Sequence, residues 1–170
     1  VYSWSIIAAE LIDNYGFTIF QSQILFGAII AIFPLTMVIA GKLSRIVHYR
    51  FFGVISGILF FLGYGIASFS KGNFLVLLAS IGLLVGMATG FGYWLALTIP
   101  VQNFPHRKGL VTGITAAGFG LGAVFMSQIA ESFFIRGYSV LQLFRLIGIV
   151  YGALILGFSF LIRKAGAKLE

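Results

Sequence analysis

The sequence predicts an all-α fold, a polytopic transmembrane bundle of six helices. Six apolar blocks fill the chain, and short polar gaps separate them. Hydrophobic residues make up 60% of the chain and charged residues only 9%, and the mean hydropathy is +1.08. A water-soluble domain of 170 residues could not bury this much apolar surface, so the blocks are expected to lie in lipid.

The expected helices cover approximately residues 1–12, 18–40, 51–69, 74–99, 110–134 and 141–162. The last five approach or exceed the roughly 20 residues that a helix needs to cross a bilayer. The first block is too short and opens on Val1 with no basic flank or small-residue cleavage site, so we interpret it as a cut helix and not a signal peptide. Residues 1–170 are expected to form one helical domain, itself a fragment of a longer protein.

Local signals mark where these helices begin and end. Thr18 followed by Gln21 fits a capping box at the start of the second helix. Turns are expected at 13–16, 70–73 and 136–139, where Gly, Asn, Asp and Ser gather. Pro100 and Pro105 are expected to mark the exit of the fourth helix. Connections this short force neighbouring helices to run antiparallel.

Glycines recur at four-residue spacing within the expected helices. Lipid tails are as apolar as Leu, so helices in a bilayer associate by close backbone approach, which Gly permits. The spacing fits static packing and also fits smooth faces that slide during a transport cycle, and it does not separate the two. The glycines concerned are Gly53 and Gly57; Gly82, Gly86 and Gly90; Gly109 and Gly113; Gly118 and Gly122; Gly148 and Gly152.

The net charge of +7 is distributed unequally between the two sides of the expected bundle. Nucleic-acid binding is not expected, because the basic residues lie in short separate loops and not in one patch. The positive-inside rule places the richer side in the cytoplasm, which puts both termini there in a multi-pass protein of the cell membrane. The richer side holds Lys42, Arg45, Arg50, Arg107, Lys108, Arg163, Lys164 and Lys168, and the other holds Lys71, Arg136 and Arg145.

The sequence gives no indication of an enzyme. It has no Ser-His-Asp pairing at membrane depth, no phosphate-binding Gly loop after a strand and no metal-ligand cluster. The chain has no cysteine, which excludes disulfides and thiolate metal sites. No cofactor and no metal are therefore expected.

Two motifs carry a family resemblance. The stretch 103–122, NFPHRKGLVTGITAAGFGLG, resembles the fifth-helix signature of the monocarboxylate transporter and oxalate–formate antiporter families of the major facilitator superfamily. Tyr2-Ser3-Trp4-Ser5 is similar to the aromatic cluster in the first helix of the oxalate–formate branch.

This resemblance implies the N-terminal six-helix half of a twelve-helix transporter, built from two inverted three-helix repeats. It implies secondary transport of a small organic anion, a mono- or dicarboxylate, by alternating access. The implied partners are the lipid bilayer, a second six-helix half on the same or another chain and, as a candidate coupled ion, a proton.

The chain departs from the family pattern in two places. Members carry an acidic residue in the loop after the second helix, where this chain has Arg45. The gate loops that the resemblance implies, around Arg45, Arg50, Arg107 and Lys108, therefore lack the usual charge latch. This loss slightly favours the alternative of a non-transporting scaffold or receptor-like module. Val1 also replaces a Gln of the oxalate-transporting member, which argues mildly against the same dicarboxylate.

The resemblance also implies substrate-binding residues on helices one, four and five. They are Tyr2, Trp4, Thr89, Tyr93 and Phe119; Thr89 and Tyr93 share a helix face at i, i+4 spacing. Phe119 stands where the family often has Tyr. The alternative, that these are ordinary buried aromatic residues, stays open. No cation lies at mid-depth, and the resemblance implies that it comes from the other half.

Overall fold

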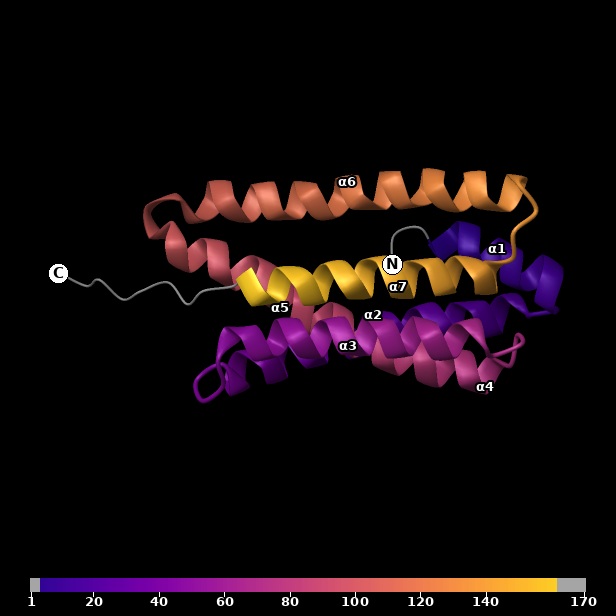
Figure 1. Ribbon diagram of the computed structural model, residues 1–170, viewed down its shortest axis with the longest axis horizontal. Coiled ribbons are helices and arrows are strands. Elements are labelled where there is room, and N and C mark those ends of the chain that lie inside the picture. Colours follow the sequence, from indigo (N-terminus) through magenta and orange to yellow (C-terminus); the bar gives the residue numbers. More distant parts are fainter. Residues whose placement is uncertain (1–3, 162–170) are drawn as a thin grey trace.

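The computed structural model describes residues 4–161, and all regular elements within them are helices (Figure 1). In chain order they are α1 (Trp4–Tyr15), α2 (Ile19–Leu43), α3 (Tyr49–Ser68), a continuous rod of α4 (Phe74–Leu77), a π-helical segment (Leu78–Val85) and α5 (Gly86–Asn103), then a 3-10 turn (Pro105–Arg107), α6 (Lys108–Ile135) and α7 (Val140–Leu161). The prediction for Tyr2 falls outside the described residues.

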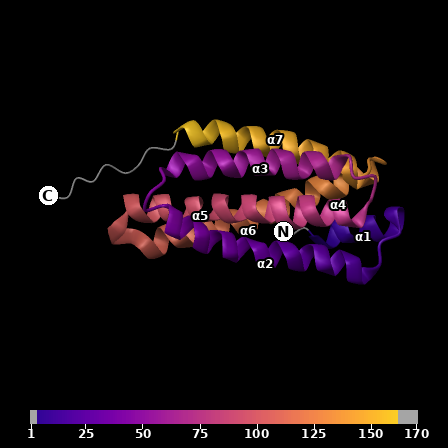
Figure 2. The ribbon, with the colours of Figure 1, turned by 90° about the horizontal axis from the view of Figure 1, so that it is seen from below.

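The helices run side by side along one axis and form an elongated bundle (Figures 1 and 2). Five of them are long and apolar enough to cross a membrane, and α1 has 12 residues. The predicted all-α, multi-pass membrane fold with a short first helix is thus confirmed for the part of the chain that is described.

Some predicted boundaries were wrong. α1 continues through Asp13 to Tyr15, where a turn was predicted, and only Gly16 adopts a positive φ of 67°. Tyr15 packs onto Gly72, where a Cβ would meet its ring at 2.5 Å, so a distant turn holds the last helical residue. α5 runs past Pro100 to Asn103, whose side-chain amide donates to the Ile99 carbonyl at 3.0 Å.

The capping box at the start of α2 is confirmed. The Gln21 amide donates to Thr18 Oγ1 at 3.1 Å, and the Thr18 amide donates to Gln21 Oε1 at 3.0 Å. Asn73 caps α4 in a similar way, since its side-chain oxygen accepts from the Leu75 amide at 3.0 Å. These caps satisfy backbone donors that the helix starts leave without partners.

The π-helical segment within the fourth rod was not predicted. Its sequence, LASIGLLV, is apolar except for Ser80 and contains one glycine, Gly82. The Ser80 hydroxyl of this segment donates to the Val76 carbonyl of α4 at 2.7 Å. π-helical turns often lie near functional sites.

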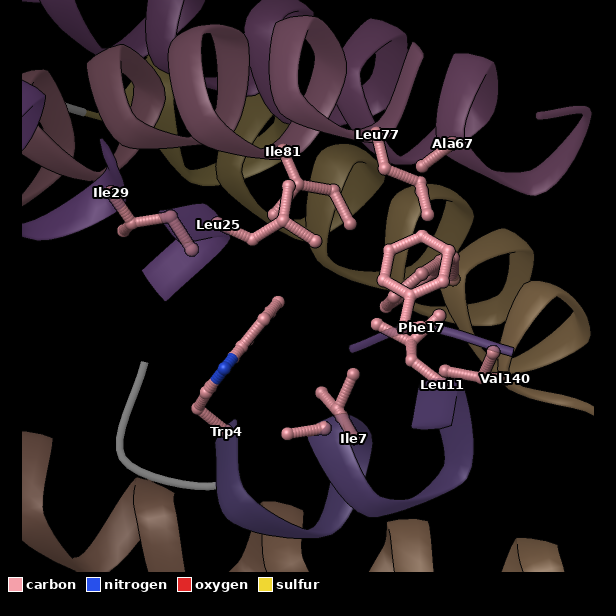
Figure 3. Packing of buried hydrophobic residues seen from close by; sticks show 12 residues of the cluster. Trp4, Ile7, Leu11, Phe17, Leu25, Ile29, Ala67, Leu77, Ile81 and Val140 are labelled. Atoms are coloured by element: carbon pink, nitrogen blue, oxygen red, sulfur yellow. The ribbon is translucent and has the colours of Figure 1, made fainter. Parts of the chain in front are cut away.

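Three clusters of buried apolar side chains hold the bundle together. The largest gathers residues from α1, α2, α3, α4, α7 and the π-helical segment, among them Leu11, Leu25, Leu77 and Phe144 (Figure 3). A second lies near the opposite end around Ala40, Phe52 and Leu95. A third joins Ala130 of α6 to α7.

Glycines bring α3 against α7 and α2 against α5. A Cβ on Gly57 would lie 2.7 Å from Leu156 Cγ, and one on Gly152 would lie 3.1 Å from Phe61 Cβ. A Cβ on Gly90 would lie 2.7 Å from the Phe33 carbonyl oxygen. The predicted close approach is confirmed for these helices.

The glycines of α6 behave differently. At Gly109, Gly113, Gly118 and Gly122 an added Cβ would meet nothing within 4 Å. The prediction of close packing is therefore wrong for α6 as far as its contacts with residues 4–161 are concerned. The same spacing shows which face can accept a close neighbour, but not whether that neighbour is present.

Two arginines join the ends of the antiparallel pair α3 and α7. Arg50, in the first turn of α3, donates to the Phe160 carbonyl near the end of α7. Arg145, in the second turn of α7, donates from Nε to Ser68 Oγ at the end of α3, at 3.1 Å, and its guanidinium lies 5.0 Å from the Phe69 ring centre. Each cation thus sits at the negative end of the partner helix, where the helix dipole favours it.

Candidate functional site

Two neighbouring cavities lie between α6 and the rest of the bundle. Cavity A has a volume of about 540 Å³ and lies among α3, α5, α6 and α7. Cavity B has a volume of about 310 Å³ and reaches from α6 to α1, α2 and the π-helical segment. Each is of the size that small-molecule sites occupy.

Cavity A has an almost wholly apolar lining, which includes Tyr93, Ala96 and Phe158. Its serine hydroxyls already donate to backbone carbonyls: Ser56 to Ala88 at 2.7 Å and Ser159 to Ile155 at 2.5 Å. A polar ligand group in cavity A therefore finds few donors, and its desolvation would cost free energy.

Cavity B carries more hydrogen-bonding groups. Trp4 lines it, is only 7% exposed, and its indole Nε1 has no hydrogen-bond partner among the described residues. The indole lies against Phe26, with 6.2 Å between ring centres, and rises from α1 towards Leu25 and Ile81 (Figure 3). Indole Nε1–H is a donor only, and a buried donor without an acceptor is unfavourable, so a rotation of the ring that brings this N–H to an acceptor atom in cavity B would remove that cost.

Two tyrosines complete the polar lining of cavity B. Tyr151 donates to Met126 Sδ at 3.7 Å, a weak interaction that a better acceptor could replace. Tyr64 lies in the same lining and stacks on Phe60, with 5.8 Å between ring centres. Cavity B can therefore offer two phenol donors and, once the Trp4 ring rotates, one indole donor.

A shared wall separates the cavities. Phe60 of α3, Thr89 of α5 and Phe119 of α6 line both of them. The Thr89 hydroxyl donates to the Val85 carbonyl of its own helix at 2.7 Å. This wall is thin enough for each of three side chains to face both spaces.

The structure brings three of the predicted site residues together and sets a fourth apart. Tyr93 and Phe119 make an edge-to-face contact with 4.8 Å between ring centres, and Thr89 lies one turn from Tyr93. Phe33 of α2 extends this row, 5.4 Å from Tyr93. Trp4 lines cavity B only and Tyr93 lines cavity A only, so these residues surround two spaces and not one. Their role in substrate binding stays a prediction.

Sequence reasoning missed several lining residues on α3 and α7. Phe60, Tyr64 and Tyr151 were not considered, because the resemblance pointed to helices one, four and five. Ser56 stands between Gly53 and Gly57, and a polar residue in a small-residue stripe was the available signal. Its hydroxyl bridges α3 to α5.

No charged side chain lines cavity A or B in the part of the chain that is described. Within the same residues no group of three or more His, Cys, Asp or Glu could hold a metal ion. A carboxylate in either cavity therefore needs a cation from beyond the described lining.

The four predicted gate residues lie at one end of the bundle. Arg45 is exposed in the loop after α2, and Arg107 and Lys108 stand exposed where α6 begins. Arg50 is bound to the end of α7. The described carboxylates, Glu10, Asp13 and Glu131, lie on the other side of the bundle, so the described chain supplies no acidic latch at the basic end.

Comparisons with known proteins support the resemblance. No protein-family model matches the chain. It is 34% identical over 124 residues, 73% of its own length, to a protein described as an uncharacterized MFS-type transporter YhjX of Escherichia coli, of which it covers 31%. It is 33% identical over 86 residues to the oxalate:formate antiporter of Oxalobacter formigenes, and 30% identical over 80 residues to apicoplast pyruvate carrier 1 of Toxoplasma gondii.

The matches cover 50% and 47% of this chain, and 20% and 15% of those two proteins. The chain thus spans less than a third of each of the three relatives. The similarity to transporters of the major facilitator superfamily is confirmed, and the relatives are named as transporters and carriers, not enzymes.

Proposed function

We propose that this chain, which resembles part of a major facilitator superfamily transporter, is the N-terminal six-helix half of a secondary carrier for a small organic anion. The substrate is a mono- or dicarboxylate that crosses the membrane by alternating access. The observation that carries this proposal is a pair of cavities under α6, one of which is lined by Trp4, whose buried donor has no acceptor among the described residues. Two relatives are named for oxalate, formate and pyruvate.

The proposed transport cycle depends on a cation that the described cavity lining does not supply. A carboxylate in a low-dielectric cavity is unfavourable without a compensating charge. Since the described lining supplies none, we place that charge on a second six-helix half, on the same or a separate chain. The anion is then bound well only when both halves contribute, so binding favours one conformation of the two halves over another.

α6 is the surface that we assign to the second half. Of its 28 residues only Ala130 is buried, and its glycine faces are open. Small residues let membrane helices approach closely, so a helix of the second half can pack where the described part of this chain provides no neighbour.

The proposed orientation follows from charge. Arg45, Arg50, Arg107 and Lys108 stand at one end of the bundle, which the positive-inside rule assigns to the cytoplasm. We place both ends of this single domain, residues 1–170, on that side of the cell membrane. The loops around these residues then form the cytoplasmic gate, with acidic partners outside the described residues. A proton remains the candidate coupled ion.

Counterflow in proteoliposomes tests the proposal. The complete protein that carries this chain should exchange at least one of lactate, formate, oxalate and pyruvate with saturable kinetics. Tyr93→Ala should reduce uptake several-fold, because it removes the ring between Phe33 and Phe119, whereas Tyr93→Phe keeps both ring contacts and should retain more. Unchanged kinetics in Tyr93→Ala would remove Tyr93 from the site.

A non-transporting scaffold or receptor-like module is the second candidate. Arg45 at the position of the family's acidic latch residue favours it. A scaffold would show no saturable exchange with any of the four anions.

A further inference from the structure

We infer that Phe119 is a gate between two compartments of one ligand path, and that the polar group of the ligand is held in cavity B beside Trp4. This inference rests on the proposed function, because it assigns separate tasks to the two cavities of the proposed site.

The first argument is the chemistry of the two compartments. Cavity A lies towards the basic end, with Ala96, Pro100 and Phe158 in its lining, and its serine hydroxyls are engaged by backbone carbonyls. Cavity B is lined by the indole of Trp4, whose Nε1 has no partner within residues 4–161, and by the weakly engaged hydroxyl of Tyr151. A carboxylate loses its water shell in either space, but cavity B offers it more hydrogen-bonding groups than cavity A does.

The second argument is the difference among the three members of the shared wall. Phe60 is stacked on Tyr64, and the Thr89 hydroxyl is bound to the backbone of its own helix. Both side chains belong to α3 and α5, which bury many residues against their neighbours. These two members form the fixed part of the wall.

Phe119 differs from these two because it belongs to the helix that buries the fewest residues of the three. It is 36% exposed and stands on α6. Gly118 and Gly120 flank it, and a Cβ at either would meet nothing within 4 Å. Its edge-to-face contact with Tyr93 holds the ring across the wall. A turn of this ring, or a small displacement of α6, joins cavity A to cavity B without disturbing the packed helices.

Single-cysteine accessibility tests the gate without a transport assay. The chain has no cysteine, so Ala96→Cys reports on cavity A and Ala123→Cys on cavity B. The complete protein is used, with any cysteine outside this chain replaced by Ser, in vesicles whose Arg45 end faces outward. The probe is 2-sulfonatoethyl methanethiosulfonate, a small anion that does not cross membranes.

We expect the cysteine at 96 to react at least about tenfold faster than the cysteine at 123. Phe119→Ala should bring the two rates within about twofold of each other, and Phe119→Trp should widen the difference. Val124→Ala is the matched control, because Val124 lies on α6, is exposed and lines neither cavity. It should leave the ratio unchanged.

Three results would overturn the gate: similar rates with Phe119 in place, a ratio that Phe119→Ala does not change, or no reaction at position 96. If the gate is absent while counterflow is saturable, the proposed function stands and this inference fails. If the gate is present and counterflow is absent, the bundle has two compartments but does not transport the anions tested.

A separate measurement tests whether Trp4 holds the polar group of the ligand. Trp4→Phe keeps an aromatic ring and removes the donor, so the anion concentration for half-maximal counterflow should rise about tenfold. Trp94→Phe is the control, because Trp94 lines neither cavity. An unchanged half-maximal concentration in Trp4→Phe would place the polar group elsewhere.

Discussion

The α3–α7 pair and α6 carry glycines in the same four-residue pattern, yet they are packed in opposite ways. α3 and α7 meet through Gly57, Gly148 and Gly152, and arginines join their ends. α6 has one buried residue and runs along the edge of the bundle (Figure 1). In a bilayer, lipid-exposed apolar surface costs little, so packing contacts decide which helices are held firmly. We call the closely packed helices α2, α3, α5 and α7 the frame. We call α6, which can move against them, the mobile wall.

The largest expected effect comes from filling a glycine of the frame. Gly90→Ala places a Cβ 2.7 Å from the Phe33 carbonyl oxygen and 2.6 Å from Thr36 Cβ, and the backbone atom cannot rotate away. We expect a loss of about 1–3 kcal/mol in the free energy of unfolding, measured by denaturant titration in detergent micelles.

Gly113→Ala on α6 is the counterpart. Its added Cβ meets nothing within 4 Å among the described residues, so in the bundle of residues 1–170 alone the free energy of unfolding should change by less than about 0.5 kcal/mol. Equal losses at Gly90 and Gly113 would mean that α6 is packed as firmly as the frame.

A smaller effect is expected from replacing Arg145, which joins the start of α7 to the end of α3. Arg145→Gln removes the bond to Ser68 and the contact with the Phe69 ring. The expected loss is about 0.5–1.5 kcal/mol in the free energy of unfolding. Arg136→Gln, just after α6, is the control and should have little effect; a larger loss there than at Arg145 would contradict the assignment.

The smallest effect separates hydroxyl bonds between helices from those within one. Ser56→Ala removes the bond from α3 to the Ala88 carbonyl of α5 and should cost about 0.6 kcal/mol. Thr115→Val removes a bond to the Val111 carbonyl within α6 and should be close to neutral. Thermal unfolding of both variants in the same detergent measures the difference, and a more destabilised Thr115→Val would reverse the comparison.

The helix count, the membrane spans and the cap at Thr18 could be predicted from sequence, because each depends on residues close together in the chain. The end of α1 could not, because Tyr15 is held by Gly72, which is distant in sequence. Nor could the open face of α6, whose glycines match those of α3 in spacing.

In the candidate site, too, contacts between residues distant in sequence could not be predicted from local patterns alone. Thr89, Tyr93 and Phe119 were selected through the resemblance and do lie together. Phe60, Tyr64 and Tyr151 reach the cavities only because α3 and α7 pack as they do, and no local pattern marks them. The π-helical segment, in a largely apolar run, also had no local signal.

Distances between spin labels on α6 and on the frame test most directly whether α6 is the moving wall of an anion site. Labels at Leu62 of α3 and Ile149 of α7 report on the frame, and labels at Val124 of α6 and Ile149 report on the wall; all three positions are exposed. The frame distance should be narrow and unchanged by substrate anion, whereas the wall distance should be broad and should shift when the anion binds. A wall distance as narrow as that of the frame, and unmoved by anions that the protein exchanges, would contradict the mobile wall.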